Sequence, residues 1–376
     1  MINQNQNYKP ELILHIGHEK TGTSSIQKTM SNNYFKLLKQ GVLYPIRKCP
    51  RSNHSLILFW LSNSTFKDEI YLRNKKWLEK DASNFLNAIN EDINKYNPHT
   101  VVLSAEHLFK DFSFSTKQNF SKFLNQYFSN VKIILYVRSP FSALISSVGQ
   151  RIRTAKRNIF PKIYQSLKKI VCYYESQFPQ NVYIRPFDTK QLVDGDIVND
   201  FFKNYLPSIT FEKIKKKRVN NSLSWLILTK LYQINKKFYI FNNLERRVLI
   251  RHYTKKLLLK ATGEDMKKIP KFRTEFIEKY HQNIIENYLW LNDKYKIIFS
   301  DFDYKKNFSR ENLKLFSSKV NLEDIFHYDK NLDIDIKNPN YLFLKFLYLS
   351  SLIKRYISHF RQLNWQLKKL NLLIKN

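Results

Sequence analysis

The stretch Leu12-Ile13-Leu14-His15-Ile16-Gly17-His18-Glu19-Lys20-Thr21-Gly22-Thr23-Ser24-Ser25 decides the fold. The run from Leu12 to Ile16 is apolar apart from His15 and predicts a buried β-strand. A helical pattern from Ser25 to Lys39 follows the second glycine. A strand, a glycine loop and a helix in this order direct backbone N–H groups and a helix N-terminus at an anion. The stretch therefore predicts an anion-binding loop in a fold of strands and helices.

The spacing from Gly17 to Gly22 equals that of a phosphate-binding P-loop, but the lysine is displaced. A nucleotide-kinase loop needs lysine directly after the second glycine, and this chain has Thr23 there. The lysine lies inside the loop instead, at Lys20. A P-loop nucleotide kinase is therefore the disfavoured interpretation of this loop.

Further β-rich runs along the first half of the chain are separated by helical patterns: Thr100–Leu103, Val131–Val137 and Val182–Phe187. Strands that alternate with helices are typical of a parallel sheet, whose ligands bind at the carboxyl ends of the strands. After Asp196 the pattern is mostly helical: Asp196–Tyr205, Ser222–Lys236, Leu244–Leu259 and Thr274–Leu291. We expect an α/β fold, with a parallel β-sheet flanked by helices and a helix-rich C-terminal half.

Polarity divides the chain into three expected parts. These are a main domain over residues 1–307, a polar linker over 308–340 and a basic amphipathic helical tail over 341–376. In the tail, apolar residues recur every three or four positions among basic residues, and no acidic residue is present. Two interpretations stay open: the apolar stripe packs on the main domain, or it lies on an anionic membrane surface.

The formal net charge of +33 restricts the partners. Nucleic acid, an anionic membrane surface and an anionic substrate or cofactor are the three classes that such a charge attracts. No acidic residue lies between Asp111 and Glu175, although a solvated basic face explains many of these lysines equally well. Nucleic acid is disfavoured as a partner because the chain has neither a recognition-helix motif nor an aromatic RNA-binding motif.

Cysteine content and apolar patterning indicate the compartment. Cys49 and Cys172 form neither a metal-binding spacing nor a disulfide framework, which favours a reducing compartment. Residues 1–9 are polar and lack the apolar core of a signal peptide. The most apolar stretch, Tyr341–Ile353, is too short to span a bilayer. We expect a cytoplasmic protein, with a peripheral contact at the inner face of the membrane if the tail binds lipid.

With its lysine inside the loop, the stretch His15–Gln27 resembles the 5′-phosphosulfate loop of bacterial carbohydrate-type sulfotransferases. These enzymes use 3′-phosphoadenosine 5′-phosphosulfate (PAPS) as sulfuryl donor and release 3′,5′-ADP. The resemblance implies a P-loop NTPase-like core. It also implies donor contacts from six loop residues: Lys20, Thr21, Gly22, Thr23, Ser24 and Ser25. By analogy with phosphoryl transfer, Lys20 places positive charge at the bridging oxygen. The donor sulfate is a monoanion, so we expect no metal to be required.

A second motif follows the expected strand Val131–Val137. Arg138 ends that strand, Pro140 fits the first turn of a helix, and Ser146 lies inside that helix. The spacing of Arg138 and Ser146 resembles the family's 3′-phosphate motif. The resemblance implies that the planar Arg138 fork binds the 3′-phosphate and that the Ser146 hydroxyl adds a hydrogen bond.

Transfer to a hydroxyl needs a general base near the acceptor. Glu106 and His107 follow the expected strand Thr100–Leu103, which ends in the same crevice as the loop. We expect Glu106 to be the base, with His107 as the alternative. His15 and His18 flank the loop and are interpreted as packing or loop hydrogen-bonding residues.

The resemblance extends over residues 11–303 and leaves the acceptor class open. Arg218 lies in a late basic stretch that corresponds to a loop over the nucleotide in sulfotransferases, although a solvated basic turn explains it equally well. The Glu106-His107 pair favours sugar acceptors over phenols. We expect an O-sulfotransferase that transfers a sulfuryl group from PAPS to a hydroxyl of a carbohydrate or glycolipid in cell-surface polysaccharide modification.

Overall fold

The computed structural model describes most of the first three hundred residues. The described ranges are 8–18, 20–49, 53–55, 75–109, 122, 124–159, 167–210, 214–216, 223–239, 243–260 and 282–305. The expected linker, the tail and Arg218 lie outside these ranges.

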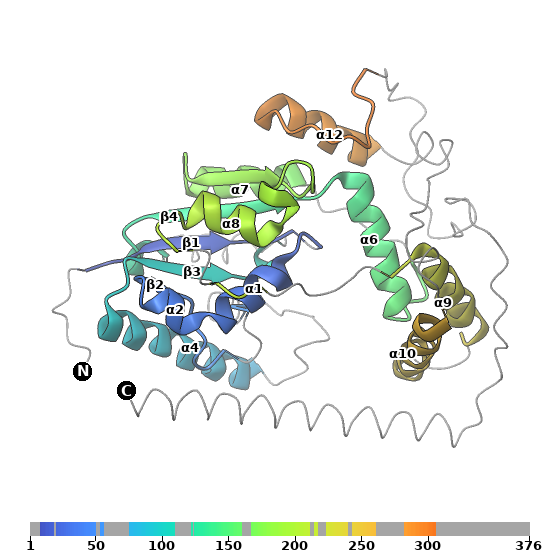
Figure 1. The fold of residues 1–376 in the computed structure, drawn as a ribbon, viewed down its shortest axis with the longest axis horizontal. Coiled ribbons are helices and arrows are strands. Elements are labelled where there is room, and N and C mark those ends of the chain that lie inside the picture. Colours follow the sequence, from blue (N-terminus) through green and yellow to red (C-terminus); the bar gives the residue numbers. More distant parts are fainter. Residues whose placement is uncertain are drawn as a thin grey trace. The chain divides into compact units, whose positions relative to one another are not determined.

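In the part of the chain that the structure describes, five parallel strands form one sheet (Figure 1). They are β1 (Glu11–His15), β2 (Val42–Leu43), β3 (Thr100–Ser104), β4 (Val131–Val137) and β5 (Val182–Pro186). Their order across the sheet is β2-β3-β1-β4-β5. In the register, Leu14 of β1 pairs with Leu103 of β3 and with Ile133 of β4. The chain therefore has the expected α/β fold with a parallel sheet.

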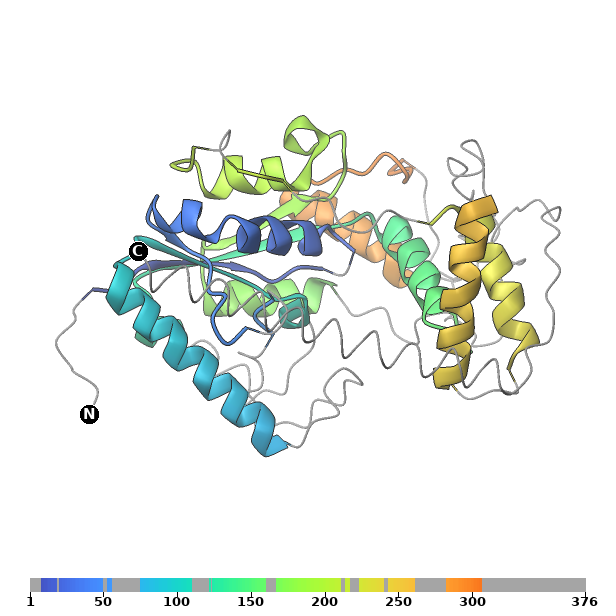
Figure 2. The same ribbon diagram turned by 60° about the horizontal axis from the view of Figure 1, so that its bottom comes forward.

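Helices cover both faces of this sheet. The α-helices are α1 (Thr23–Asn32), α2 (Tyr34–Leu38), α4 (Lys75–Tyr96), α6 (Pro140–Arg153), α7 (Leu167–Gln177), α8 (Ile197–Tyr205), α9 (Trp225–Lys237), α10 (Asn243–Lys260) and α12 (Gln282–Tyr295). Short 3-10 turns are η2 (Glu106–Phe109) and η3 (Val193–Gly195). Figure 2 shows α1 and α8 on one face, and α4 and α7 on the other.

Because helices cover both faces of the sheet, most residues of the central strands are apolar. Leu12, Ile13 and Leu14 are 0–1% exposed, and every residue of β3 is buried. The edge strand β5 is only partly buried. The predicted strands are confirmed to within one residue at each end because these runs carry a strong signal.

The described residues fall into two compact units, which are considered separately. The first unit holds the sheet together with α1, α2, α4, α7, α8 and nearly all of α12. The second unit holds α6 from Leu144 onward together with α9 and α10. Within it, the buried Arg246 guanidinium donates to the Ala155 carbonyl, with its Nη2 at 3.2 Å. Among the described residues, no helix combines the length and apolarity needed to cross a membrane.

One predicted helix is interrupted. The pattern from Ser25 to Lys39 forms α1 and α2, which are separated at Asn33. The Asn33 side chain donates to the carbonyls of Thr29 and Lys215, at 2.8 and 3.0 Å, and accepts from the Lys215 amide at 3.1 Å. These bonds favour a non-helical backbone at Asn33.

Candidate functional site

The glycine loop lies where the strand order of the sheet reverses. Strand β1 lies between β3 and β4. The connection from β1 leads toward the β2 edge, and the connection from β4 leads toward the β5 edge. In parallel α/β sheets, the crevice at such a switch point is where ligands bind. The loop after β1 and Arg138 after β4 lie at the carboxyl ends of these neighbouring strands.

The loop backbone is tightly curved and is fixed by its own side chains. Lys20 and Gly22 have φ values of 67° and 77°, both in the left-handed region. The hydroxyl of the fully buried Thr21 donates to the His18 carbonyl at 2.7 Å. Left-handed residues in a short turn gather backbone N–H groups into an anion-binding concavity. Thr21 therefore supports the loop with its side chain.

Both glycines are required by close approaches within the first unit. A Cβ atom at Gly17 would lie 2.6 Å from Thr23 Oγ1. A Cβ atom at Gly22 would lie 2.9 Å from Ile197 Cγ2, on the first residue of α8. Because Gly22 is also left-handed, any larger residue there meets both backbone strain and a clash. The N-terminus of α8 thus fixes the position of the second glycine.

Helix α1 begins directly at this loop. The Gly22 carbonyl accepts from the amides of Ser25 and Ile26 at 2.8 and 3.3 Å. The first turn of α1 carries no acidic residue, so its orphan N–H groups and its dipole are available to an external anion. Thr23 Oγ1 is buried and makes no hydrogen bond with any described residue. An anion with several oxygen atoms would supply acceptors for these amides and for this hydroxyl.

Arg138 contacts the loop from the end of β4. Its Nη1 donates to the Lys20 carbonyl at 3.3 Å, and its guanidinium lies 5.9 Å from the centre of the Phe187 ring. The structure therefore brings the Arg138 side chain to the backbone of Lys20, and the roles of both residues stay predictions. Phe187 was missed as a residue of this site, because an aromatic residue after a strand carries no functional signal by itself.

The residues that follow Arg138 are held by a segment from far along the chain. The Ser139 hydroxyl contacts Tyr288 Oη at 2.8 Å and also donates to the Asp301 carboxylate. Tyr288 Oη donates to Asp301 Oδ1 at 3.1 Å and accepts from the Phe141 amide at 3.1 Å. This clasp of Ser139, Tyr288 and Asp301 fixes the start of α6 beside Arg138.

The expected base lies on the turn after β3. Glu106 begins η2 and is partly buried, and the Ala105 amide before it donates to the His15 carbonyl at 3.0 Å. This bond joins the end of β3 to the start of the glycine loop. The backbone of His107 lies on the same 3-10 turn, and its side chain lies outside the described part of the structure.

His15 and His18 occupy the interior beside the loop. Burial lowers the pKa of His15 to about 3. Burial, and secondarily the Arg138 guanidinium, lower the pKa of His18 to about 4. His15 Nδ1 is bonded to Ser104 Oγ at 2.9 Å, and the His18 ring packs edge-on against Phe109. Both imidazoles are therefore neutral at pH 7, which agrees with the packing roles that the sequence favours.

A third buried imidazole, that of His54, predicts a measurable loss of folding stability at acid pH. His54 Nδ1 accepts from the Ser104 amide at 2.8 Å, so the proton lies on Nε2, which donates to the Pro45 carbonyl at 2.9 Å. Burial lowers the pKa of His54 to about 4, against 6.5 in the unfolded chain. The unfolded chain therefore binds more protons below pH 6.5, and stability is lost as the pH falls from 6.5 toward 4.

We expect the free energy of unfolding to fall by about 2 kcal/mol per such histidine between pH 7 and pH 5. Chemical denaturation at both pH values measures this loss. In the variant His54→Asn, the amide oxygen still accepts from the Ser104 amide but does not titrate. Its loss should be about 2 kcal/mol smaller than that of the wild type. Equal losses in both proteins would show that His54 does not carry this pH dependence.

Four expected site residues remain: Ser24, Ser25, Ser146 and Arg218. Ser24 and Ser25 lie in the first turn of α1, and Ser24 is partly exposed. Ser146 lies on α6, in the second unit, and is partly exposed. Arg218 lies outside the described residues, so its role stays a prediction. Within the described ranges, no group of three or more His, Cys, Asp or Glu residues is placed to hold a metal ion.

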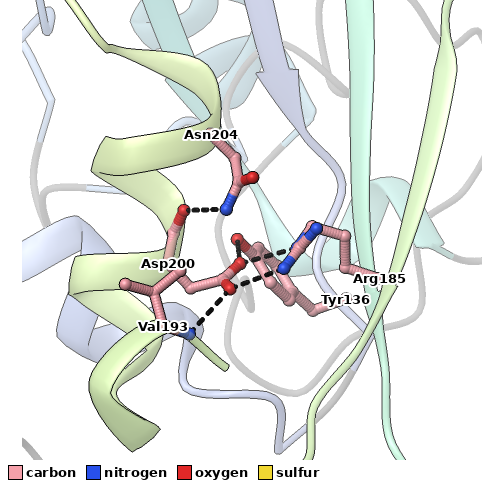
Figure 3. A network of polar contacts seen from close by, with 5 residues as sticks. All are labelled: Tyr136, Arg185, Val193, Asp200 and Asn204. Carbon is pink, nitrogen blue, oxygen red and sulfur yellow. Dashed lines mark hydrogen bonds and ion pairs between the residues drawn. The ribbon is translucent and has the colours of Figure 1, made fainter. Parts of the chain in front are cut away.

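A buried charge network anchors α8 to the sheet (Figure 3). The fully buried Asp200 of α8 accepts two bonds from Arg185, at 2.7 and 2.8 Å, and one from Tyr136 Oη at 2.7 Å. It also accepts from the Val193 amide at 3.0 Å. The network ties α8 to β4 and β5. Because Ile197 at the start of α8 contacts Gly22, Asp200 supports the loop indirectly.

No protein-family model and no curated protein matches this chain. Among solved structures, it is similar to a chain from the PezAT chromosomal toxin–antitoxin system of Streptococcus pneumoniae. The two share 11% sequence identity over 63% of this chain and 88% of that chain, with a TM-score of 0.26. A likeness this low carries no argument about function, which must come from the site itself.

Proposed function

We propose that the protein is a PAPS-dependent O-sulfotransferase. The contact between Arg138 and the Lys20 carbonyl carries the proposal, because it joins two motifs that are separated by more than a hundred residues. One motif fits a 5′-phosphosulfate and the other fits a 3′-phosphate. A nucleotide that carries an anionic group at each of these positions suits a site with both motifs at one switch point.

The residues of the loop have distinct proposed tasks. The amides of the first turn of α1 and the Thr23 hydroxyl bind the 5′-phosphosulfate oxygens, and the Lys20 ammonium stabilises the charge that develops on the leaving 5′-phosphate. Arg138 binds the 3′-phosphate through its planar fork. PAPS, when bound, supplies an activated sulfuryl group. This division of tasks leaves the Glu106 carboxylate to accept the proton of the acceptor hydroxyl.

The acceptor that we propose is a hydroxyl of a carbohydrate or glycolipid. The support is the sequence pair Glu106-His107, which resembles the pair in sulfotransferases that act on sugars. Incubation with radiolabelled PAPS and separate panels of polysaccharides, glycolipids and phenols tests this choice. Label that appears in phenols alone would overturn it. Membrane association of residues 341–376 stays a separate prediction.

A thermal shift assay separates the proposed function from its rivals. We expect 3′,5′-ADP to raise the melting temperature more than ATP or a DNA oligonucleotide at equal concentration, because ligands that bind the native state stabilise it by mass action. A larger shift with ATP would favour a nucleotide kinase. A larger shift with DNA would favour a nucleic-acid-binding protein.

Arg138→Ala should weaken the binding of 3′,5′-ADP more than the binding of 5′-AMP. Only 3′,5′-ADP carries the phosphate that Arg138 is proposed to hold, and a charge-assisted bidentate contact contributes about 1.5–3 kcal/mol. Isothermal titration calorimetry with both nucleotides measures the difference. The control is Arg153→Ala, at an exposed position at the end of α6. Equal losses for the two nucleotides would make Arg138 a structural residue.

A further inference from the structure

Ser104 lies at the junction of three elements of the site. It is the last residue of β3, it is fully buried, and it stands two positions before Glu106. Its hydroxyl contacts His15 Nδ1 at 2.9 Å, at the end of β1. The same hydroxyl accepts from Gln27 Nε2 of α1 at 3.2 Å. One side-chain oxygen thus joins the loop strand, the loop helix and the strand that leads to Glu106.

The backbone of Ser104 is bonded as fully as its side chain. Its amide donates to His54 Nδ1 at 2.8 Å, and its carbonyl accepts from the His54 amide at 2.9 Å. The carbonyl also accepts from Gln27 Nε2 at 3.3 Å. A buried polar group that is satisfied in every direction has one preferred position, because any shift leaves a partner unpaired.

The turn that carries Glu106 follows Ser104 almost directly, with only Ala105 between them. The Ala105 amide donates to the His15 carbonyl at 3.0 Å, and the Leu108 amide donates to the Ala105 carbonyl at 3.2 Å. The Glu106 turn is therefore held by these backbone bonds, and it directly follows a residue that contacts both β1 and α1. These are the elements that carry the anion-binding loop.

We propose that the Ser104 hydroxyl is a positioning group, which fixes the Glu106 turn relative to the anion-binding start of α1. The role of Glu106 as a base rests on the proposed function, whereas the order imposed on the turn does not. Proton transfer requires heavy-atom distances of about 2.6–3.2 Å. A displacement of about 1 Å in a reacting group can cost a factor of about 100 in rate.

The kinetic test uses Ser104→Ala, which removes the hydroxyl and keeps the backbone bonds. We expect kcat for sulfuryl transfer to fall about 10- to 100-fold. The dissociation constant of 3′,5′-ADP should stay within about twofold, because the loop contacts are retained. The control is Ser224→Ala, which removes a buried serine hydroxyl that accepts from the Ile227 amide at 3.4 Å in the second unit. A parallel loss of kcat and of nucleotide affinity in Ser104→Ala would overturn the proposal.

A double-mutant cycle with Gln27→Leu tests the connection to α1. Both substitutions remove the hydrogen bond between Gln27 Nε2 and Ser104 Oγ. The double variant should therefore lose less activity than the product of the two single losses. Losses that simply multiply would show that the hydroxyl does not couple the turn to α1, and would overturn the proposal.

Hydrogen exchange gives a readout that does not depend on activity. The amides of Ala105 and Leu108 should exchange about 5- to 10-fold faster in Ser104→Ala than in the wild type or in Ser224→Ala. Unchanged exchange at both amides would overturn the proposal whatever the activity. If the wild type neither binds 3′,5′-ADP nor transfers sulfuryl groups, the proposed function fails. The exchange rates still decide whether Ser104 orders the turn.

Discussion

Lys20→Ala should lower kcat for sulfuryl transfer by about 100- to 1,000-fold while the melting temperature stays close to that of the wild type. A preorganised positive group that acts on developing charge typically contributes a factor of this size. Because the charge on the leaving oxygen is largest in the transition state, KM for PAPS should change much less than kcat. Steady-state kinetics together with a thermal melt of each protein measure both quantities.

The matched control for this substitution is Lys48→Ala. Lys48 also has a left-handed backbone, with a φ of 52°, and its side chain is exposed in a turn. The two variants therefore carry a comparable backbone cost, and only one of them loses a charge at the loop. A Lys20→Ala enzyme with turnover near that of the wild type would remove Lys20 from the mechanism.

Glu106→Gln should reduce sulfuryl transfer about 100- to 10,000-fold, the range that general base catalysis contributes. The amide keeps the volume of the side chain and cannot accept the proton of the acceptor. Binding of 3′,5′-ADP should remain close to wild type, because the base contacts the acceptor rather than the donor. Rapid-quench assays with labelled PAPS and calorimetry with 3′,5′-ADP separate these effects.

A comparison with His107→Ala assigns the base between the two neighbouring candidates. If His107→Ala abolishes transfer and Glu106→Gln does not, the roles of the two residues are exchanged. A Glu106→Gln protein that also loses its affinity for 3′,5′-ADP would indicate that Glu106 shapes the loop instead of acting on the acceptor.

Four of the five described strands were predictable from the sequence, and the order of the strands was not. The run Val131–Val137 is apolar apart from Lys132 because both faces of the sheet are covered, and such a run predicts a buried strand from the sequence alone. Strand β2 contains only Val42 and Leu43, too few residues for any periodicity. The order β2-β3-β1-β4-β5 depends on pairings between distant segments, which alternation of strands and helices does not specify.

The candidate site was predictable as separate pieces. Lys20 and Arg138 each follow a predicted strand, and a lysine or arginine at such a point carries a chemical signal. The contact between them requires β1 and β4 to be neighbours, which only the structure supplies. Ser104 and Gln27 carry no such signal, because buried serine and glutamine residues are ordinary in α/β proteins and their significance lies in their partners.

The clasp of Ser139 by Tyr288 and Asp301 can form only after residue 301 has been synthesised. Ser139 leaves the ribosome 162 residues before Asp301. At about 5–20 residues per second this interval is roughly 8–30 s. Throughout it, the start of α6 beside Arg138 lacks the partners that fix it in the finished fold. The strands β1 to β5 can therefore pair in the nascent chain before Tyr288 and Asp301 are present to hold the start of α6 beside Arg138. The contacts that fix the start of α6 beside Arg138 are therefore complete only after the segment that carries Asp301 has been synthesised.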